Sequence, residues 1–260
     1  HFITLNTKEK FPTLFYKAFS KYALQDILIL EEQIKRIDRE LREFFTLVLI
    51  NASLKCSYAY KDGSVIKIKR RPVAPLRKML RRSVSRMIKD IEKSGMQKTP
   101  VTIEMNDARR LPLDDESVDA IITSPPYLNQ IDYTKVYSIE EHFIRGEPVP
   151  GVRAYIGLKA KECDFLPELA LPIQARLYFE DMNLVLNEFY RVLKKNSKAA
   201  IVIGNGYVDE IIDSDIILAY LADKIGFEVE NIFVLNTRFA LEGRTIKKGI
   251  LRESLIILKK

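Results

Sequence analysis

The chain has 260 residues, of which 47% are hydrophobic and 30% are charged, and its formal net charge is +7 at pH 7. This length and apolar content allow a sizeable buried core, so we expect one large domain or one domain with a helical attachment. No stretch approaches the roughly 18 apolar residues of a membrane span, and no signal-peptide pattern opens the sequence. Cys56 and Cys163 are too few for a disulfide framework or a zinc site. The composition therefore predicts a soluble, cytoplasmic protein without a bound metal.

The first periodic segment, residues 27–48, predicts a long amphipathic helix. Its apolar residues alternate spacings of three and four, with charged residues between them. They are Ile27, Leu30, Ile34, Ile37, Leu41, Phe44 and Val48. Such an apolar face packs on its own domain or forms a dimer seam. Because the helix spans barely three heptads, packing on its own domain is favoured. Residues 58–64 then predict a loop with a turn at Asp62-Gly63, and residues 65–68 predict a short strand or extended arm.

A strongly basic segment follows, because no acidic residue occurs between Gly63 and Lys89. Leucines, isoleucines and other apolar residues at helical spacing predict a helix over residues 76–91 that docks by one side and shows cations on the other. Charge runs of this kind are often solvated faces. The alternative is a surface that binds nucleic-acid phosphates. The cations expected in that role are Arg70, Arg71, Arg77, Lys78, Arg81 and Arg82.

The most informative stretch is the sequence Ile121-Ile122-Thr123-Ser124-Pro125-Pro126-Tyr127. Branched apolar residues in a run too short for a helix predict a strand covered on both faces. The two prolines end this strand, since they cannot donate to a ladder and they hold the preceding residue out of the helical region. Open α/β sheets place their ligands at the carboxyl ends of such strands.

This turn carries hydrogen-bond acceptors and a flat ring. The Ser124 hydroxyl and the Pro125 carbonyl can converge on one NH2 group, while Tyr127 offers a face on which a base can stack. An ordinary loop also explains a Pro-Pro-Tyr sequence taken alone. Asn129, Asp132 and Tyr133 come just after the turn, where contacts to a target are natural, although the chemistry of a helix start explains them almost as well.

The rest of the chain predicts alternating strands and helices. Residues 144–176 predict an irregular excursion beside the site, which could shape target recognition. Gly226 has the position of a helix C-cap, and Gly204-Asn205-Gly206 that of a turn at a strand end. The predicted helices are residues 177–193 and 211–225, and the predicted strands are residues 199–203, 229–235 and 254–258. The last two strands are candidates for an antiparallel pair at one edge of the sheet.

The Ser124-Pro125-Pro126-Tyr127 sequence resembles the catalytic motif of the S-adenosylmethionine-dependent amino-methyltransferases. In that family Asp, Asn or Ser precedes Pro-Pro and an aromatic residue, and the serine form is similar to DNA methylases that modify the exocyclic amine of cytosine. The resemblance extends to the run from Asn106 to Asp119 and to the segment 186–194, and so covers residues 100–260. It implies a Rossmann-like α/β methyltransferase sheet, partial and mostly parallel with an antiparallel edge, over residues 99–260. Residues 1–98 form the predicted helical and basic region, packed on that domain.

The resemblance also implies functions for particular residues. Ser124, Pro125, Pro126 and Tyr127 would grip a flipped base, Asp107 and Ala108 would contact S-adenosylmethionine, and Tyr133 would join the cations on DNA, with RNA a less favoured substrate. For Asp107, a turn carboxylate that caps the next segment is an equal alternative. The form of the motif favours cytosine over adenine. No Pro-Cys dipeptide occurs, in keeping with direct transfer to nitrogen rather than to carbon five of cytosine.

One part of the family pattern is missing from these residues. The cofactor site of the family depends on a glycine-rich turn after its first strand, and no such turn precedes the motif. Three explanations remain open: an upstream segment carries it, a partner chain supplies it, or the chain is a methylase-like nucleic-acid-binding subunit that has lost catalysis.

Overall fold

The computed structural model describes residues 10–62, 65–95, 99–128, 133–145, 162–208, 210–242 and 246–260. By their internal contacts these residues form two compact units, one of residues 1–102 with 133–152 and one of residues 103–132 with 153–260. Residues 133–145, which form two helices, therefore belong with the first unit. The predicted boundary between residues 98 and 99 instead assigns them to the second domain. That domain division stays a prediction, as does the packing of its two parts on each other.

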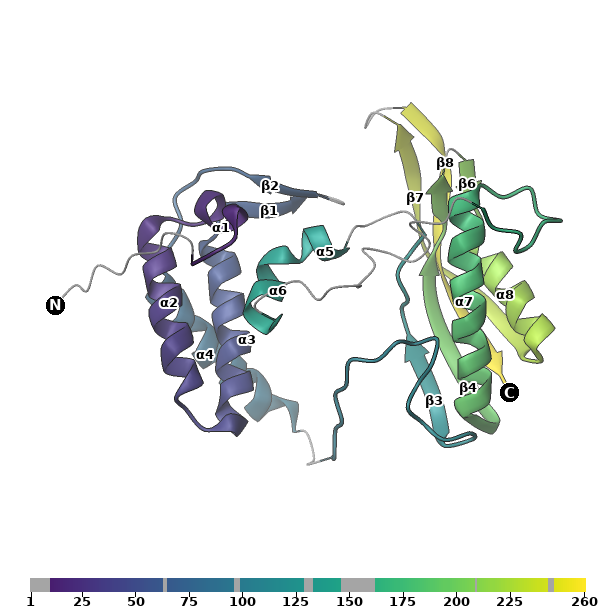
Figure 1. Ribbon diagram of the computed structural model, residues 1–260, viewed down its shortest axis with the longest axis horizontal. Coiled ribbons are helices and arrows are strands. Elements are labelled where there is room, and N and C mark those ends of the chain that lie inside the picture. The colour runs from purple at the N-terminus through teal and green to yellow at the C-terminus, as the bar shows by residue number, and fades with distance from the viewer. Residues whose placement is uncertain are drawn as a thin grey trace. The chain divides into compact units, whose positions relative to one another are not determined.

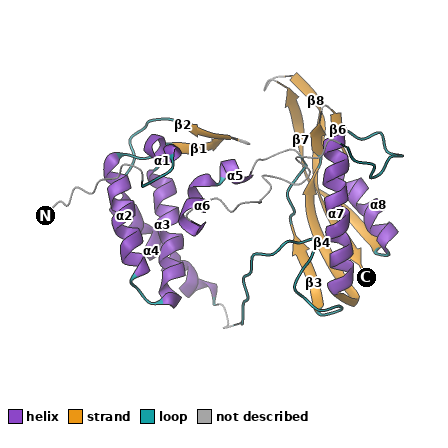
Figure 2. Cartoon of the chain, in the orientation of Figure 1, coloured by secondary structure: helices purple, strands orange, loops and turns teal. Residues whose placement is uncertain are grey.

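The first unit is helical, with one small hairpin (Figures 1 and 2). Its elements are α1 (Thr13–Ala18), α2 (Lys21–Lys35), α3 (Arg39–Cys56), β1 (Ala59–Asp62), β2 (Val65–Ile68), α4 (Leu76–Ser94), α5 (Tyr133–Val136) and α6 (Ser138–Arg145). Helices α2, α3 and α4 pack together around a shared apolar core. Buried residues of this core include Phe15, Leu24, Ile27, Leu49, Leu76 and Ile139.

The prediction of one continuous helix over residues 27–48 was wrong, because the chain turns between α2 and α3. Asp38 adopts an extended conformation, and its carbonyl accepts hydrogen bonds from the Leu41 and Arg42 amides at 3.1 and 3.0 Å, which starts α3. The Arg42 guanidinium donates to the carbonyls of Lys35 and Ile37 at 3.0 and 3.3 Å and so satisfies the end of α2. The apolar spacing continues through the turn since the two helices fold back on one core.

Two other predictions in this unit have different outcomes. The helix predicted over residues 76–91 is confirmed as α4, which ends at Gly95 in the left-handed conformation with φ 58°. The loop predicted over residues 58–64 was wrong in its first part, because Ala59–Asp62 pairs antiparallel with Val65–Ile68. The strand at residues 65–68 is confirmed, and the turn at Gly63 lies outside the described residues.

The second unit is an α/β structure with a mixed sheet. Its elements are β3 (Val118–Thr123), α7 (Ile173–Val192), β4 (Leu193–Gly204), β5 (Gly206–Val208), β6 (Glu210–Ile212), α8 (Ser214–Ile225), β7 (Glu228–Glu242) and β8 (Ile246–Lys259). The main sheet has the order β3-β4-β8-β7, while β5 and β6 form a separate pair. β3 and β4 are parallel, and β8 is antiparallel to both β4 and β7. The α/β class and the antiparallel pair at one edge are confirmed. The prediction of a mostly parallel sheet was wrong for the described strands, because β8 pairs antiparallel with both of its neighbours and only β3 and β4 are parallel.

Helices α7 and α8 pack against one face of this sheet (Figure 1). Ala199, Ile201 and Ile203 of β4 alternate toward them and are fully buried. The helices and strands predicted downstream of the motif are confirmed, with the difference that residues 210–212 are strand and α8 begins at Ser214. Gly226 is confirmed as a left-handed C-cap, with φ 117°. Among the described residues, no helix is both long enough and apolar enough to span a bilayer.

The prediction that β3 is covered on both faces was wrong. Ile121 packs against the core formed with α7 and α8. Its neighbour Ile122 points the other way and is 86% exposed. Within the described strands, β3 is an edge strand with one covered face.

Candidate active site

The Ser-Pro-Pro-Tyr turn lies at the carboxyl end of β3, as the sequence predicted. β3 runs parallel to β4 with Ile122 opposite Ala200 and Thr123 opposite Ile201. The pairing stops at Ser124 since the next two residues have no amide hydrogen to donate. Ser124 is exposed, whereas Pro125, Pro126 and Tyr127 are half-buried. A stiff segment thus leaves the sheet at the edge where α/β proteins place their ligands.

Two tyrosine hydroxyls fix the second half of this turn. The buried Tyr178 of α7 donates to the Pro126 carbonyl at 2.9 Å. Tyr127 donates to Glu253 Oε1 of β8 at 2.6 Å, and its ring packs against the core of the unit. A bond to a carboxylate is stronger than a neutral one, so Tyr127 is held firmly. Tyr178 and Glu253 were not identified from the sequence.

The first half of the turn presents its acceptors without competition. The Ser124 hydroxyl and the Pro125 carbonyl have no hydrogen-bond partner among the residues that the structure describes. They are the two acceptors that the sequence predicted for an NH2 group. The neighbouring Pro126 carbonyl is already satisfied by Tyr178. The turn therefore offers two adjacent free acceptors on a backbone that is anchored from behind.

Leu128 anchors the chain where it leaves the turn. Its side chain is buried and lies against Gly206, at the start of β5. A Cβ atom at position 206 would lie 2.7, 2.8 and 2.9 Å from Cδ2, Cγ and Cβ of Leu128. These separations are far below an ordinary carbon contact of about 3.5–4.0 Å. Gly206, in the turn that the sequence identified only as a strand end, is thus required for the close approach of Leu128.

An ion-pair chain holds Asp107 to α7. The Asp107 carboxylate accepts from Arg109 Nε at 3.0 Å and from Nη2 at 2.6 Å, and Arg109 Nη1 donates to Asp181 at 2.7 Å. Both carboxylates raise the pKa of Arg109 above its ordinary value, Asp107 most strongly. Asp107 also accepts from the Arg109 amide at 3.0 Å, which is the turn-capping geometry given as its alternative role. Ala108 is exposed beside it.

A second clamp holds the loop that leads into β3. Arg191 donates to both oxygens of Glu188, at 2.9 and 2.6 Å, and to the carbonyls of Leu113 and Leu111 at 2.8 and 3.2 Å. Glu188 accepts from the Leu111 amide at 2.7 Å. The hydrogen bonds from Arg191 lower the pKa of Glu188 below its usual range. Both residues of this pair belong to the segment 186–194, and together they hold the loop that leads into β3.

A buried carboxylate supports β8 beside the Tyr127 anchor. Asp215 accepts from Arg252 Nε and Nη2, at 3.1 and 3.0 Å, and from the Ser254 hydroxyl at 2.7 Å. Burial alone would raise the pKa of Asp215, but the hydrogen bonds from Arg252 and Ser254 lower it below its ordinary value. Because Arg252 and Ser254 flank Glu253, this network fixes the strand that holds the Tyr127 hydroxyl.

The predicted phosphate-binding cations all lie in the first unit, and none belongs to the unit that carries the turn. Arg70 and Arg71 are exposed in the segment before α4, and the other four are on α4 itself. Lys78 and Arg82 lie one helical turn apart, and neither forms an ion pair with another of the described residues. Arg77 differs, since its Nε donates to Asp26 of α2 at 2.8 Å. That carboxylate reduces the free positive charge at one predicted contact.

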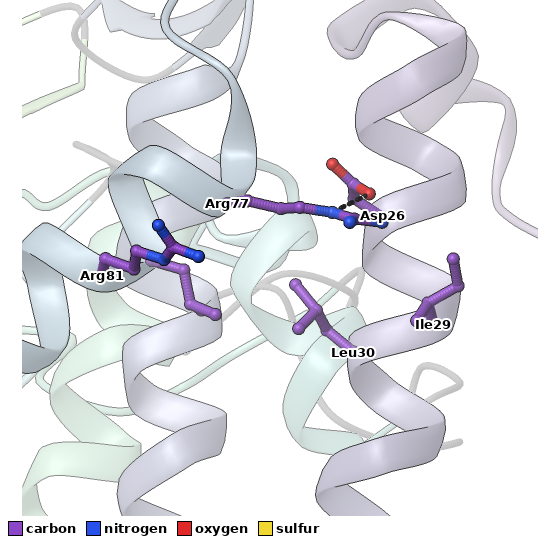
Figure 3. Close-up of a pocket in the computed structure, with 6 residues that line it drawn as sticks. Asp26, Ile29, Leu30, Arg77 and Arg81 are labelled. Carbon is purple, nitrogen blue, oxygen red and sulfur yellow. Dashed lines mark hydrogen bonds and ion pairs between the residues drawn. The ribbon is translucent and has the colours of Figure 1, made fainter. Parts of the chain in front are cut away.

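Arg77 and Arg81 meet at a pocket between α2 and α4 (Figure 3). Its volume is about 300 Å³. The other lining residues are Asp26, Ile29, Leu30 and Leu80. The pocket is thus an apolar hollow with two guanidinium groups and one carboxylate, and none of the residues of the Ser-Pro-Pro-Tyr turn lines it.

Tyr133 belongs to an aromatic and basic cluster of the first unit. Its ring stacks on Tyr137 with centroids 6.2 Å apart and an angle of 10° between the planes. Lys61 Nζ lies 3.5 Å from the centroid of the Tyr137 ring and 2.6 Å from Glu140. Asn129 and Asp132, which were also predicted to face a target, lie outside the described residues.

Potential metal-binding side chains of the chain include Cys56, Cys163 and His142. In the described ranges, no three His, Cys, Asp or Glu residues cluster so that they could hold a metal ion. Cys56 is buried, which raises the pKa of its thiol to about 11, and Cys163 is a free, half-buried thiol. His142 packs against Phe15, with ring centroids 4.5 Å apart, and against Phe143.

Comparison with known proteins points to methyltransferases. No family model matches the chain. It is 28% identical over 158 residues to the Type II methyltransferase M.AvaI of Nostoc sp., covering 46% of this chain and 33% of that protein. It is 24% identical over 200 residues to the Type II methyltransferase M.BsoBI of Geobacillus stearothermophilus, covering 57% and 39%. The chain thus spans little more than a third of the length of these curated relatives.

Two solved structures show a weak likeness. One is a protein from Thermus thermophilus assigned as a DNA modification methylase, in complex with S-adenosyl-L-methionine, with 20% identity and a TM-score of 0.36 over 59% of this chain and 53% of that chain. The other is a SAM-dependent methyltransferase from Methanosarcina mazei, with 14% identity and a TM-score of 0.32 over 67% and 76%. Likeness at this level carries no argument about the geometry of the turn.

Proposed function

We propose that this chain is the base-binding part of an S-adenosylmethionine-dependent DNA amino-methyltransferase, with cytosine favoured over adenine as the target. One observation carries the proposal. The Ser124 hydroxyl and the Pro125 carbonyl are free acceptors at the carboxyl end of β3 among the described residues, and the residues after them are fixed by Tyr178 and Glu253. The similarity to Type II methyltransferases supports the same assignment.

The two acceptors suit an exocyclic amine, which has two hydrogens to donate. Its lone pair is delocalised into the base ring, so the amine is a poor nucleophile. Hydrogen bonds from both hydrogens to Ser124 and Pro125 favour a more tetrahedral nitrogen, whose lone pair is then available for attack. S-adenosylmethionine would supply the methyl group and leave as S-adenosylhomocysteine, while the methylated amine would release one of its protons to solvent. Preorganised acceptors of this kind contribute most when they need no rearrangement during the reaction, and the anchored turn meets that condition.

The residues present fit a methyl donor only in part. Both oxygens of the Asp107 carboxylate are engaged by Arg109. Gly204 is the last residue of β4 and Gly206 is the first residue of β5, and the space at Gly206 is filled by Leu128. The Gly204-Asn205-Gly206 turn is thus the glycine-containing turn that follows a strand next to β3 in the described part of the chain, and Leu128 packs into it. Contacts from Asp107 and Ala108 to the donor therefore remain part of this proposal, and no reaction step is derived from them.

DNA is the proposed substrate because it offers both an exocyclic amine for the turn and phosphates for the basic surface of the first unit. A base inside a duplex must be flipped out, at a cost of roughly a few kcal/mol. Stacking on Tyr127 would offset about 1–3 kcal/mol of that cost. Exposed cations of α4, with Arg70 and Arg71, would bind phosphates, and Tyr133 would stack or position the strand.

Methyl transfer tests the proposal directly. Radiolabelled S-adenosylmethionine is incubated with the protein and duplex DNA, tRNA or protein substrate. We expect label in DNA, and we expect Ser124→Ala to lose it by more than a hundredfold without loss of stability, because Ser124 is exposed. Ser117→Ala is the matched control, since this hydroxyl only closes a turn with the Asp114 carbonyl. Label that appears only in tRNA or protein would show that DNA is not the substrate. Full activity of Ser124→Ala would show that the turn is not the active site.

A nucleic-acid-binding subunit without catalysis is the second candidate, and the engaged Asp107 carboxylate favours it. Calorimetric titration with S-adenosylmethionine separates the two, because a binding subunit gives no signal. Either function predicts salt-sensitive DNA affinity, and the slope of log affinity against log salt becomes smaller by about 0.9 for each phosphate that is no longer neutralised. We expect Lys78→Glu and Arg82→Glu to reduce that slope. Lys195→Glu, an exposed change in the other unit, is expected to leave it unchanged.

A further inference from the structure

The pocket between α2 and α4 is lined by residues of the first unit alone. Its lining residues have the spacing of one helix face on each side, at positions 26, 29 and 30 of α2 and positions 77, 80 and 81 of α4. Its volume of about 300 Å³ is at the small end of the range of about 300–1,000 Å³ for ligand sites. The pocket therefore suits one small ligand.

The polar groups of the pocket lie at two depths. The side chain of Asp26 is 19% exposed and that of Arg77 is 67% exposed. Arg77 Nε donates to Asp26 Oδ1 at 2.8 Å, which fixes the plane of the guanidinium group (Figure 3). Within the described residues, Asp26 Oδ2 accepts no hydrogen bond, and the exposed Arg81 guanidinium has no partner. The pocket thus offers a deep acceptor and several donors at its rim.

The charges around the pocket select an anionic ligand. One carboxylate faces two guanidinium groups, and Lys78 and Arg82 add positive charge on the adjacent side of α4. An apolar amino acid has no net charge and would bring its ammonium group into this positive field. A simple carboxylic acid would leave the free oxygen of Asp26 without a donor. A nucleotide meets every condition, because it combines a flat base, donors and acceptors on the base edge, and an anionic phosphate.

Guanine is the base whose edge matches these groups. Its O6 and N7 atoms are acceptors that suit a bidentate arginine. Its N1–H and 2-amino groups are donors that suit a carboxylate. Arginine guanidinium planes also stack on bases. Adenine and cytosine have an amine where guanine has O6, and thymine has neither N7 nor a second donor.

We propose that the pocket between α2 and α4 is a binding site for a guanine nucleotide. Asp26 Oδ2 accepts from the N1–H and 2-amino edge, Arg81 donates to O6 and N7, and Arg77 stacks on the ring. The phosphate binds Lys78 on the adjacent side of the helix. This site lies beyond the proposed function and does not depend on it.

Calorimetric titration of the 260-residue chain with single nucleotides tests the proposal. We expect dGMP to bind at least about tenfold more tightly than dAMP, dCMP or dTMP. We expect dIMP, which lacks the 2-amino group, to bind about tenfold more weakly than dGMP. Asp26→Asn should bind dGMP and dIMP equally, because the acceptor for that group is lost. Arg81→Ala should lower the affinity for dGMP by about tenfold or more, whereas Arg86→Ala, an exposed cation of α4 outside the pocket, should retain it.

Several results would overturn this assignment. Equal affinity for the four nucleotides, displacement of dGMP by an equal concentration of inorganic phosphate, or equal losses from Arg81→Ala and Arg86→Ala would show attraction by charge alone. No binding of dGMP at millimolar concentration would also reject the site. Single strands of thymine with and without one guanine identify the source of the ligand, since a preference for the guanine strand indicates nucleic acid and a preference limited to dGMP indicates a free nucleotide. The titration contains no methyl donor, so its outcome is separate from that of the methyl-transfer assay.

Discussion

Substitution of Gly206 by alanine is expected to displace the proposed active-site turn through Leu128. The new Cβ would lie within 2.9 Å of three Leu128 atoms, so the leucine must move by roughly 1 Å to reach ordinary contact distance. Leu128 is only 2% exposed, so its displacement requires its packed neighbours to move as well. Overpacking of this kind costs about 1–3 kcal/mol of unfolding free energy. Because Leu128 follows Tyr127 directly, we also expect methyl transfer to fall by about a hundredfold.

A double-mutant cycle isolates this contact. Leu128→Ala alone removes a buried side chain and should cost about 2–5 kcal/mol. In the double variant the crowded Cγ and Cδ2 atoms are gone, so Gly206→Ala should cost less than it does alone. We expect the double variant to be more stable than the sum of the single changes by about 1–2 kcal/mol.

Urea denaturation of wild type and the three variants measures the free energies of unfolding in the cycle. Hydrogen exchange of residues 118–128 then shows whether the turn is displaced. Gly95→Ala is the control, because it makes the same chemical change in open space. It should cost about 1 kcal/mol through its left-handed conformation and show no coupling to Leu128. Strict additivity of Gly206→Ala and Leu128→Ala would refute the idea that this close approach anchors the turn.

Three further outcomes follow from the same contacts. Tyr178→Phe should cost about 0.5–1.5 kcal/mol of unfolding free energy and reduce methyl transfer, since the second motif proline loses its donor. Tyr220→Phe, at an exposed position of α8, should change neither, and equal activity of both variants would show that the Tyr178 hydrogen bond does not position the turn. The pKa of Asp215 is lowered in the folded state, so its network stabilises the fold above the unfolded pKa of about 3.9, and this stability is lost as pH falls through the lower pKa of the folded state. The difference in urea midpoint between wild type and Asp215→Asn should therefore shrink steadily as pH falls below about 3.9, and a constant difference there would contradict the assignment. Iodoacetamide at pH 8 should label Cys163 and spare Cys56 until unfolding, because burial raises the pKa of Cys56 to about 11; mass spectrometry reports the order of labelling.

Much of the fold follows from local patterns in the sequence. The apolar spacing of α4, the compact run at residues 199–203 and the glycine after α8 each identify their elements because one period or one cap dominates. The turn after Lys35 is different. Neither glycine nor proline interrupts the apolar spacing there, and only Asp38 has the chemistry of a helix start. Both helices use the same apolar stripe, so periodicity alone cannot show that the chain reverses.

The residues of the candidate site also differ in how well the sequence predicts them. Ser124 and its two prolines are contiguous, so a short motif locates them. Tyr178 and Glu253 lie 52 and 126 residues from their partners in the turn, and no spacing rule connects them. The exposure of Ile122 could not be predicted either, since a branched apolar strand predicts burial whatever supplies the covering layer.

The most direct test of the central claim is mass spectrometry of nucleosides from duplex DNA methylated with labelled S-adenosylmethionine. The reaction uses the wild-type chain or Ser124→Ala. We predict labelled N4-methylcytosine with wild type and none with Ser124→Ala. Labelled N6-methyladenine would overturn the preference for cytosine. Labelled 5-methylcytosine, or undiminished N4-methylcytosine with Ser124→Ala, would contradict the claim that Ser124 and Pro125 grip the amine that is methylated.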